Sequence, residues 1–225
     1  MDSQSVYRFS EICFIKAKTI VDDCLQHTLL ADIVTGKLSS QLFQQFSSQD
    51  VLFLDKFSRA YCELALRCEN FETFHKLLLL AKNTAEERQQ LATLFPNRTL
   101  PTGATNTYIR FLQTNLRKSW SPYACMAALV PCMKLYAYIG EQKWKEFLEL
   151  NLDSTTHPPY QWWIKFYSSE HFQQATRIAE ELLDNCETEY LDEAQQTYIQ
   201  AMYFEKQFFD NSLLPLHENL HTKED

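Results

Sequence analysis

Only three glycines occur among the 225 residues of this chain, and only seven prolines accompany them. Turns and loops depend on these two residue types more than on any other, so little material is available to interrupt regular structure. Leucine, glutamine, glutamate, alanine and lysine, which all favour helices, fill much of the remaining length. The sequence therefore predicts an all-α protein.

Apolar residues recur at the spacing of one helix face through most of the chain. The pattern predicts nine helical segments, at residues 12–33, 40–68, 71–95, 106–116, 123–139, 143–150, 160–167, 170–186 and 192–211. The breaks at 96–103, Gly140 and 153–159 contain residues that end helices or favour turns. Because no linker or repeat divides the chain, we expect one domain over residues 1–225, with a loosely ordered tail after about residue 211.

The formal net charge of −8 argues against general attraction to nucleic acids or anionic lipids, which depends on clustered lysine and arginine. No secretion signal is visible at the N-terminus. The most apolar run, Met126 to Ile139, contains Lys134 and is shorter than a membrane-spanning helix. Seven cysteines, an odd number without a CxxC pair, are typical of reduced thiols in the cytosol. We expect a soluble cytoplasmic protein without nucleic-acid or membrane partners.

A proline inside a helical pattern marks the first candidate site. Pro131 has no N–H to donate to the carbonyl of Ala127, so the helix is expected to kink there, and Cys132 follows directly. Tyr136, four residues further on, shares the helix face of Cys132. Periodicity alone leaves two interpretations open: a thiol presented to a cavity, or an ordinary core cysteine, which is the more common outcome.

Two carboxylates lie within apolar surroundings. Asp50 shares a helix face with Phe53 and Leu54, so it either caps a helix or holds a polar ligand, because burying it unpaired is costly. Glu205 is surrounded by aromatic residues, including Phe208 at i+3. Desolvation there would raise the pKa of Glu205 and suit it to act as a general acid, whereas the plainer alternative is a solvated glutamate beside Lys206.

A metal site is not indicated. Glu72 and His75 form one Glu-x-x-His unit, but di-iron carboxylate bundles need two such units and further carboxylates. No HExxH motif, phosphate-binding glycine loop or GxSxG motif is present. His157, which precedes two prolines, is interpreted as a turn residue. The sequence thus offers a thiol and two carboxylates rather than a cofactor site.

At these residues the chain resembles the TenA-type thiaminase II family, also called aminopyrimidine aminohydrolases, which have the haem-oxygenase-like helical bundle. The resemblance covers nearly the whole chain and rests on the order of several short motifs. They are Gln49-Asp50 with Phe53-Leu54, Leu100-Pro101-Thr102, Ala128-Leu129-Val130-Pro131-Cys132 with Tyr136 and Gly140, His157-Pro158-Pro159-Tyr160-Gln161-Trp162-Trp163-Ile164-Lys165-Phe166-Tyr167, and Glu205-Lys206-Gln207-Phe208-Phe209.

The resemblance implies a role for each candidate residue. Cys132 would attack a pyrimidine ring carbon, and Glu205 would protonate a ring nitrogen as that bond forms. Asp50 would hydrogen-bond the amino group of the ring and the adjacent nitrogen, which fixes the ring edge that faces the thiol. The exocyclic group then leaves, water adds and the thiolate departs. No cofactor is implied.

The resemblance also implies the walls of the site. Tyr136 and Tyr167 would polarise the thiol or the water, and Phe53 and Phe208 would enclose the flat ring. Asn106 stands where many members carry a tyrosine that contacts the substrate, and asparagine offers amide hydrogen bonds but no ring face, so we expect a thiamine breakdown product to be at least as good a substrate as thiamine.

The implied reaction forms the hydroxymethyl pyrimidine from thiamine or from its aminomethyl breakdown product, in thiamine salvage. Two alternatives remain open: a metal-dependent oxidase of the same fold, and a helical protein that binds pyrimidines without turnover. Members of the family are commonly homotetramers, so the resemblance also implies a homo-oligomer.

Overall fold

The computed structural model describes residues 7–96, 99–117, 121–150 and 158–212 of the chain. Within these residues there are ten α-helices, one short 3-10 helix (η1) and no strand. Their bounds are α1 Phe9–Lys16, α2 Lys18–Leu25, α3 Thr28–Thr35, α4 Ser40–Ala65, α5 Phe71–Leu94, α6 Gly103–Arg117, α7 Pro122–Glu149, α8 Pro158–Ser168, α9 Glu170–Asp184, η1 Thr188–Tyr190 and α10 Leu191–Ser212. The all-α prediction is confirmed.

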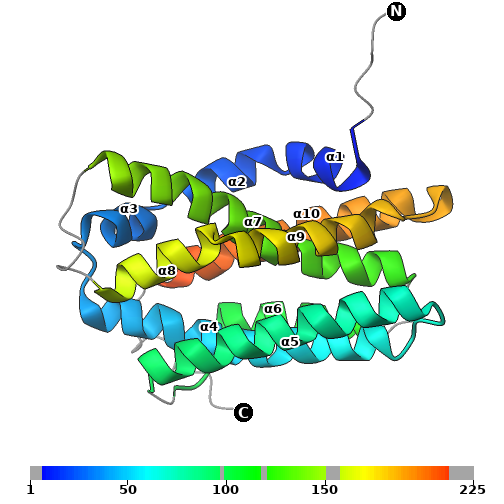
Figure 1. Cartoon of the computed structure of the whole chain (residues 1–225), viewed down its shortest axis with the longest axis horizontal. Coiled ribbons are helices and arrows are strands. Elements are labelled where there is room, and N and C mark those ends of the chain that lie inside the picture. The colour runs from blue at the N-terminus through cyan, green and yellow to red at the C-terminus, as the bar shows by residue number, and fades with distance from the viewer. Residues whose placement is uncertain (1–6, 97–98, 118–120, 151–157, 213–225) are drawn as a thin grey trace, which may run out of the picture.

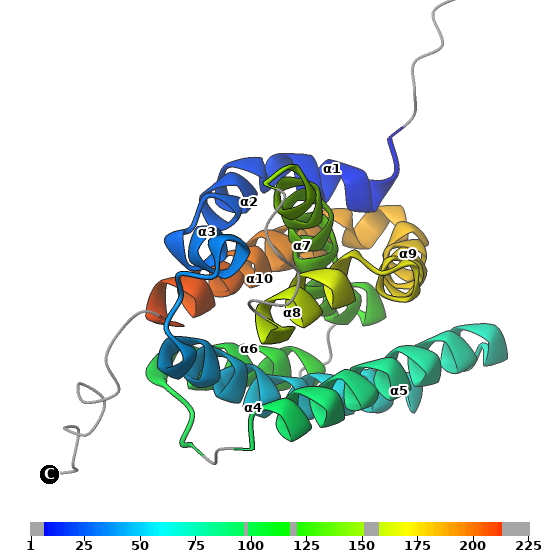
Figure 2. The ribbon, with the colours of Figure 1, turned by 60° about the vertical axis from the view of Figure 1, so that its left-hand side comes forward.

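The helices form an elongated bundle in which α7 and α10 run through the middle (Figure 1). Helices α1 and α2 lie along one long side, and α4, α5 and α6 lie along the opposite side, which a second view also shows (Figure 2). The main packing partners are α4 with α5 and α10 with α7, while α8 and α9 both pack on α7. The core therefore lies between α4, α7, α8 and α10.

Polar side chains begin several of the long helices. Ser39, Ser121 and Ser169 each accept a hydrogen bond from a backbone N–H in the first turn of α4, α7 and α9, and Asn70 does the same for α5. These contacts satisfy donors that have no partner within the helix. Asp50 lies in the second quarter of α4, so the structure excludes its alternative role as an N-terminal cap.

Two predicted boundaries are wrong. The segment predicted at residues 12–33 is divided into three helices, because the backbone turns at Ala17 and again at His27 without any glycine or proline. Conversely, Gly140 does not end a helix, and the two segments predicted on either side of it form one helix, α7. The tail predicted after residue 211 falls mainly on residues 213–225, outside the described residues, although α10 extends to Ser212.

Helix α7 is longer than the apolar run that the sequence suggested. It continues through Pro131, and by length and composition alone it could cross a membrane. In its most apolar 18-residue window, however, 83% is buried inside the protein. This burial is that of a core helix, which carries Cys132 into the centre of the bundle.

Candidate active site

A small cavity lies between five helices at the centre of the bundle. Its volume is about 10 Å³, which is space for about one water molecule. The lining residues come from α4, α5, α7, α8 and α9, and they are Asp50, Leu54, Phe57, Glu87, Cys132, Met133, Tyr136, Tyr167 and Phe172. Polar and nucleophilic side chains therefore meet at one point in an otherwise apolar core.

The thiol of Cys132 lies beside a buried tyrosine–glutamate pair. The hydroxyl of Tyr108, on α6, donates a hydrogen bond of 2.6 Å to Oε1 of Glu205, on α10. Cys132 also hydrogen-bonds Glu205. Glu205 is 2% exposed, so it does not lie on a polar stripe, and Lys206 pairs instead with Asp210. A proton donor and a thiol are thus in direct contact.

Burial sets the protonation state of these two groups. It raises the pKa of Glu205 to about 8, although hydrogen bonds from Tyr108 and Cys132 act in the opposite direction. Burial also raises the pKa of the Cys132 thiol well above its usual value, and the nearby carboxyls of Glu205, Asp50 and Glu87 add to this effect. At neutral pH both groups therefore carry a proton, and the thiol must lose its proton before it can act as a nucleophile.

A second tyrosine–glutamate pair lies on the cavity itself. The hydroxyl of Tyr167, on α8, donates a hydrogen bond of 2.6 Å to Oε1 of Glu87, on α5, and lies 3.5 Å from Oδ2 of Asp50. A hydroxyl has one proton to donate, so the short contact to Glu87 takes it. Burial raises the pKa of Asp50 to about 7 and that of Glu87 to about 8, the latter with a further contribution from Asp50.

Aromatic rings enclose the Glu205 side of the site. The ring centroid of Phe53 lies 4.5 Å from that of Tyr108 and 6.2 Å from that of Phe208. On the cavity side, the rings of Tyr136 and Tyr167 are 4.9 Å apart. The predicted site residues on α4, α7, α8 and α10 therefore lie together in the structure. The predicted residue on α6, Asn106, does not lie with them.

That exception is Asn106. The structure places it on the exposed face of α6, while Tyr108, two residues later, is 1% exposed and contacts Glu205. Residues two apart in a helix point to opposite sides, so only one of them can face the site. The prediction that Asn106 lies in the substrate site is therefore wrong. Tyr108 lies there instead, so the argument that Asn106 changes the preferred substrate no longer holds.

Glu87 is, besides Tyr108, the second site residue that the sequence analysis missed. It lies in the run Glu86-Glu87-Arg88, which is typical of a solvated surface. Its position follows the buried face of α5 nevertheless, because it lies three residues after Thr84 and four before Leu91, which are both buried. This spacing from two buried residues was the signal in the sequence that could have identified Glu87 as buried.

A glutamine on α4 positions Tyr108. Gln49 donates from Nε2 to the carbonyl of Leu100 at 3.0 Å, and its Oε1 accepts from the Thr102 backbone N–H and the Thr105 hydroxyl, both at 2.8 Å. These three bonds hold the start of α6 against α4 and thereby fix where Tyr108 enters the site.

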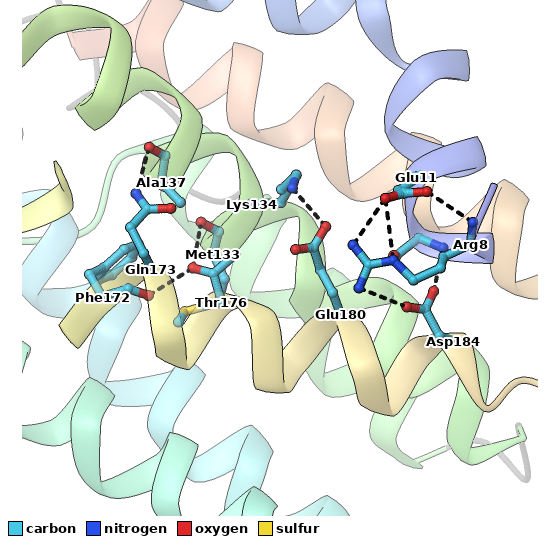
Figure 3. Close-up of polar contacts among 11 residues, drawn as sticks. Arg8, Glu11, Met133, Lys134, Ala137, Phe172, Gln173, Thr176, Glu180 and Asp184 are labelled. Atoms are coloured by element: carbon cyan, nitrogen blue, oxygen red, sulfur yellow. Dashed lines mark hydrogen bonds and ion pairs between the residues drawn. The ribbon is translucent and has the colours of Figure 1, made fainter. Parts of the chain in front are cut away.

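Tyr167 is positioned by α7 and α9. A Cβ at Gly140 would lie 2.5 Å from the backbone carbon of Tyr167, so only glycine permits this approach of α7 and α8. Gln173, on α9, donates to the carbonyls of both Ala137 and Tyr167 at 3.0 Å, and its bond to Ala137 is visible in Figure 3. The same figure shows, farther along α9, the ion pair of 2.8 Å between Lys134 and Glu180, which is separate from the cavity.

Among the described residues, no group of three or more His, Cys, Asp or Glu side chains could hold a metal ion. His75 is exposed on α5, and Glu72 pairs with Lys76 at 3.1 Å. His157 lies outside the described residues. What the site offers is a thiol, two carboxyl–tyrosine pairs and a third carboxyl, which suits covalent addition by sulfur with coupled proton transfer.

Comparison with known proteins places the chain in a family. The model of the TENA/THI-4/PQQC family matches residues 15–214. The bifunctional TH2 protein of Arabidopsis thaliana is 31% identical over 86% of this chain. The match covers only 36% of the length of that protein. An aminopyrimidine aminohydrolase of Staphylococcus epidermidis is 23% identical over 86% of this chain and 89% of its own length.

Solved structures agree on the fold. The TenA homologue of P. horikoshii superimposes with a TM-score of 0.82 at 19% identity, over 92% of this chain and 98% of that one. A domain with a heme oxygenase-like fold from Shewanella denitrificans gives a TM-score of 0.70 at 14% identity, over 92% of this chain and 93% of that one. The predicted fold class is confirmed.

Proposed function

The chain belongs to the TENA/THI-4/PQQC family, and we propose that it is a hydrolase of aminopyrimidines in thiamine salvage. The observation that carries the proposal is the contact between the Cys132 thiol and the buried, proton-bearing Glu205 beside Asp50. A relative of similar length has the name aminopyrimidine aminohydrolase, which supports the same substrate class. The proposed product is 4-amino-5-hydroxymethyl-2-methylpyrimidine, formed from the aminomethyl pyrimidine, from thiamine, or from both.

The first step is the addition of sulfur to the ring. The Sγ of Cys132 attacks a pyrimidine carbon while one oxygen of Glu205 protonates a ring nitrogen and the carboxyl takes the proton of the thiol. Glu205 therefore ends the step protonated, as it began. Addition removes the aromatic stabilisation of the ring, and the exocyclic group can then leave with the electron pair of its bond. Tyr108 holds Glu205 in place through its 2.6 Å hydrogen bond.

Recognition of the ring is assigned to Asp50. A carboxyl group whose pKa lies near 7 can donate to a ring nitrogen and accept from the adjacent amino group at the same time. This two-point contact turns one ring edge toward Cys132. Phe53 and Phe208 cover the ring, and Tyr136 borders the thiol. Because the cavity holds only about one water molecule, these side chains must move apart when a ring binds.

Two alternatives rank below this proposal. A metal-dependent oxidase needs a set of several ligands in one place, and the relatives found do not favour that activity. A pyrimidine-binding protein without turnover would have no use for a thiol and a proton-bearing glutamate in contact. The experiment below separates the proposed hydrolase from both alternatives.

The test is to incubate the purified protein with the aminomethyl pyrimidine and, separately, with thiamine, and to follow the hydroxymethyl pyrimidine by chromatography. We expect product with the wild type and none with Cys132→Ala. Cys125→Ala is the matched control, because Cys125 is buried on the same helix but does not line the cavity, and it should retain activity. Absence of product from both compounds, or full activity in Cys132→Ala, would overturn the proposal.

We also propose a cytoplasmic homotetramer. Leu66 and Phe71, near the turn between α4 and α5, are 83% and 77% exposed, which is unusual for large apolar side chains and suits a subunit contact. Seven free cysteines, of which Cys13 is fully buried, suit a reducing compartment. Sedimentation equilibrium tests the assembly, and a monomer at all concentrations would contradict it; imaging of a fluorescent fusion tests the location.

A further inference from the structure

Two tyrosine–glutamate pairs flank the nucleophile, and the proposed reaction has so far used only one. Tyr108 and Glu205 come from α6 and α10, while Tyr167 and Glu87 come from α8 and α5. The central cavity is lined by Cys132 and by the second pair but not by Glu205. The thiol of Cys132 is therefore next to Glu205 on one side and faces Glu87 across the cavity on the other.

The proposed hydrolysis needs two proton transfers besides those at the ring nitrogen. Conversion of an aminomethyl group and water into a hydroxymethyl group and ammonia requires that the leaving nitrogen gain a proton and that the water lose one. Glu205 is occupied with the thiol and the ring nitrogen. A second group that first gives a proton and later takes one back would complete the cycle with no net change in the protein.

We propose that Glu87, acting through the hydroxyl of Tyr167, is this second proton store, and that it serves the departure of the amine and the addition of water. The inference rests on the proposed function. Glu87 is a positioning residue in this scheme, because Tyr167 makes the transfer and Glu87 supplies and recovers the proton across their 2.6 Å hydrogen bond.

The surroundings of Glu87 suit a proton store. Glu87 is 5% exposed, and burial followed by the charge of Asp50 raises its pKa to about 8, so it holds a proton at neutral pH. The titratable groups that face it are Asp50 and Tyr61 on α4, Cys132 on α7 and Tyr167 on α8. From α9 the cavity receives the apolar ring of Phe172.

The steps balance. With substrate bound, the hydroxyl of Tyr167 turns from Glu87 to the leaving nitrogen and accepts instead from the protonated carboxyl of Glu87. As the C–N bond breaks, its electron pair stays with nitrogen, which takes the hydroxyl proton of Tyr167, and Tyr167 takes the proton of Glu87. Water then adds to the exocyclic carbon, its proton passes to Tyr167, and the proton of Tyr167 returns to Glu87. The C–S bond breaks last, its electron pair leaves with sulfur, and the proton on the ring nitrogen returns through Glu205 to the thiolate. With thiamine the thiazolium departs as a neutral thiazole, so the first of these transfers is not needed, Glu87 keeps its proton, and the proton lost by the water is released to solvent.

This difference between substrates provides the test. In Glu87→Gln, which keeps an oxygen that can accept from Tyr167 but holds no acidic proton, we expect kcat for the aminomethyl pyrimidine to fall at least about 100-fold. The fall for thiamine should be at least tenfold smaller, and KM for both should change less than about threefold. If the wild type does not cleave thiamine, the trimethylammonium analogue of the aminomethyl compound replaces it, because trimethylamine also leaves without a proton.

Glu180→Gln is the matched control, because Glu180 is also buried but pairs with Lys134 away from the cavity, and any loss it causes should be the same for both substrates. Should Glu87→Gln not fold, Tyr167→Phe must show the same substrate preference. An equal loss on both substrates, or no loss, would overturn the role of Glu87. A wild type without activity would instead overturn the proposed function, so the two failures are distinguishable.

Discussion

Replacing Glu205 by glutamine should make the protein more stable at alkaline pH while abolishing its activity. The change keeps an oxygen that can accept the hydrogen bond of Tyr108, but it removes a group that ionises. Burial raises the pKa of Glu205 from 4.5 to about 8 in the folded protein, which means that the fold disfavours the ionised form. An amide of the same shape carries no such penalty.

The sign and size follow from linkage. Below pH 4.5 the glutamate is protonated in both states and costs the fold nothing. As pH rises from 4.5 to about 8 the unfolded chain loses the proton first, so wild-type stability falls, and above about pH 8 the loss is complete. At about 1.4 kcal/mol for each pKa unit, the gain of Glu205→Gln at pH 9 is roughly 2 to 5 kcal/mol.

Urea unfolding followed by circular dichroism at pH 5 and pH 9 measures this gain. The variant should gain little at pH 5 and most at pH 9, with no hydroxymethyl pyrimidine formed at either pH. Glu63→Gln, at an exposed position of α4, is the control and should change stability by less than about 0.5 kcal/mol. A variant that is less stable than the wild type at pH 9, or whose gain is the same at both pH values, would refute the argument.

Three further predictions concern residues that position the site. Gly140→Ala should abolish activity and destabilise the fold by about 2 kcal/mol or more, measured by thermal unfolding, because the added Cβ meets the backbone of Tyr167. In Tyr108→Phe, loss of the hydrogen bond that lowers the pKa of Glu205 should move the alkaline fall of kcat to higher pH, and an unchanged pH–rate profile would contradict this. Gln49→Leu should cost about 2 to 4 kcal/mol in urea unfolding, because it leaves three polar groups at the start of α6 without their partner.

Much of the fold could be predicted from sequence because helix formation is a local property. Periodicity located most helices, and it failed where a boundary depends on contacts between helices. Gly140 looks like a helix end in sequence, but it is retained inside α7 for the close approach of α8. At Ala17 the reverse holds: the helix ends there, although nothing in the local sequence predicts a break.

The site was harder to predict, because its residues meet only across helices. Cys132, Asp50 and Glu205 each allowed a plain structural role, and only their ordered resemblance to a family connected them. An error of two positions was enough to choose Asn106 instead of Tyr108, since two residues along a helix reverse the direction of a side chain. Glu87 was hidden because neighbouring charges made its segment look like surface, although its register with Thr84 and Leu91 is that of the buried face.

The three carboxyls of the site explain why activity and stability should depend on the same range of pH. Asp50, Glu87 and Glu205 are at most 5% exposed, and burial is the largest cause of the raised pKa of each. No lysine or arginine among the described residues contributes to these shifts, so the site becomes neutral by holding protons rather than by pairing with cations. In the proposed reaction, ring protonation uses the proton of Glu205, amine departure uses that of Glu87, and recognition of the ring uses that of Asp50. Raising the pH through about 7 to 8 therefore removes the reactants of the proposed chemistry and charges the core of the fold at the same time.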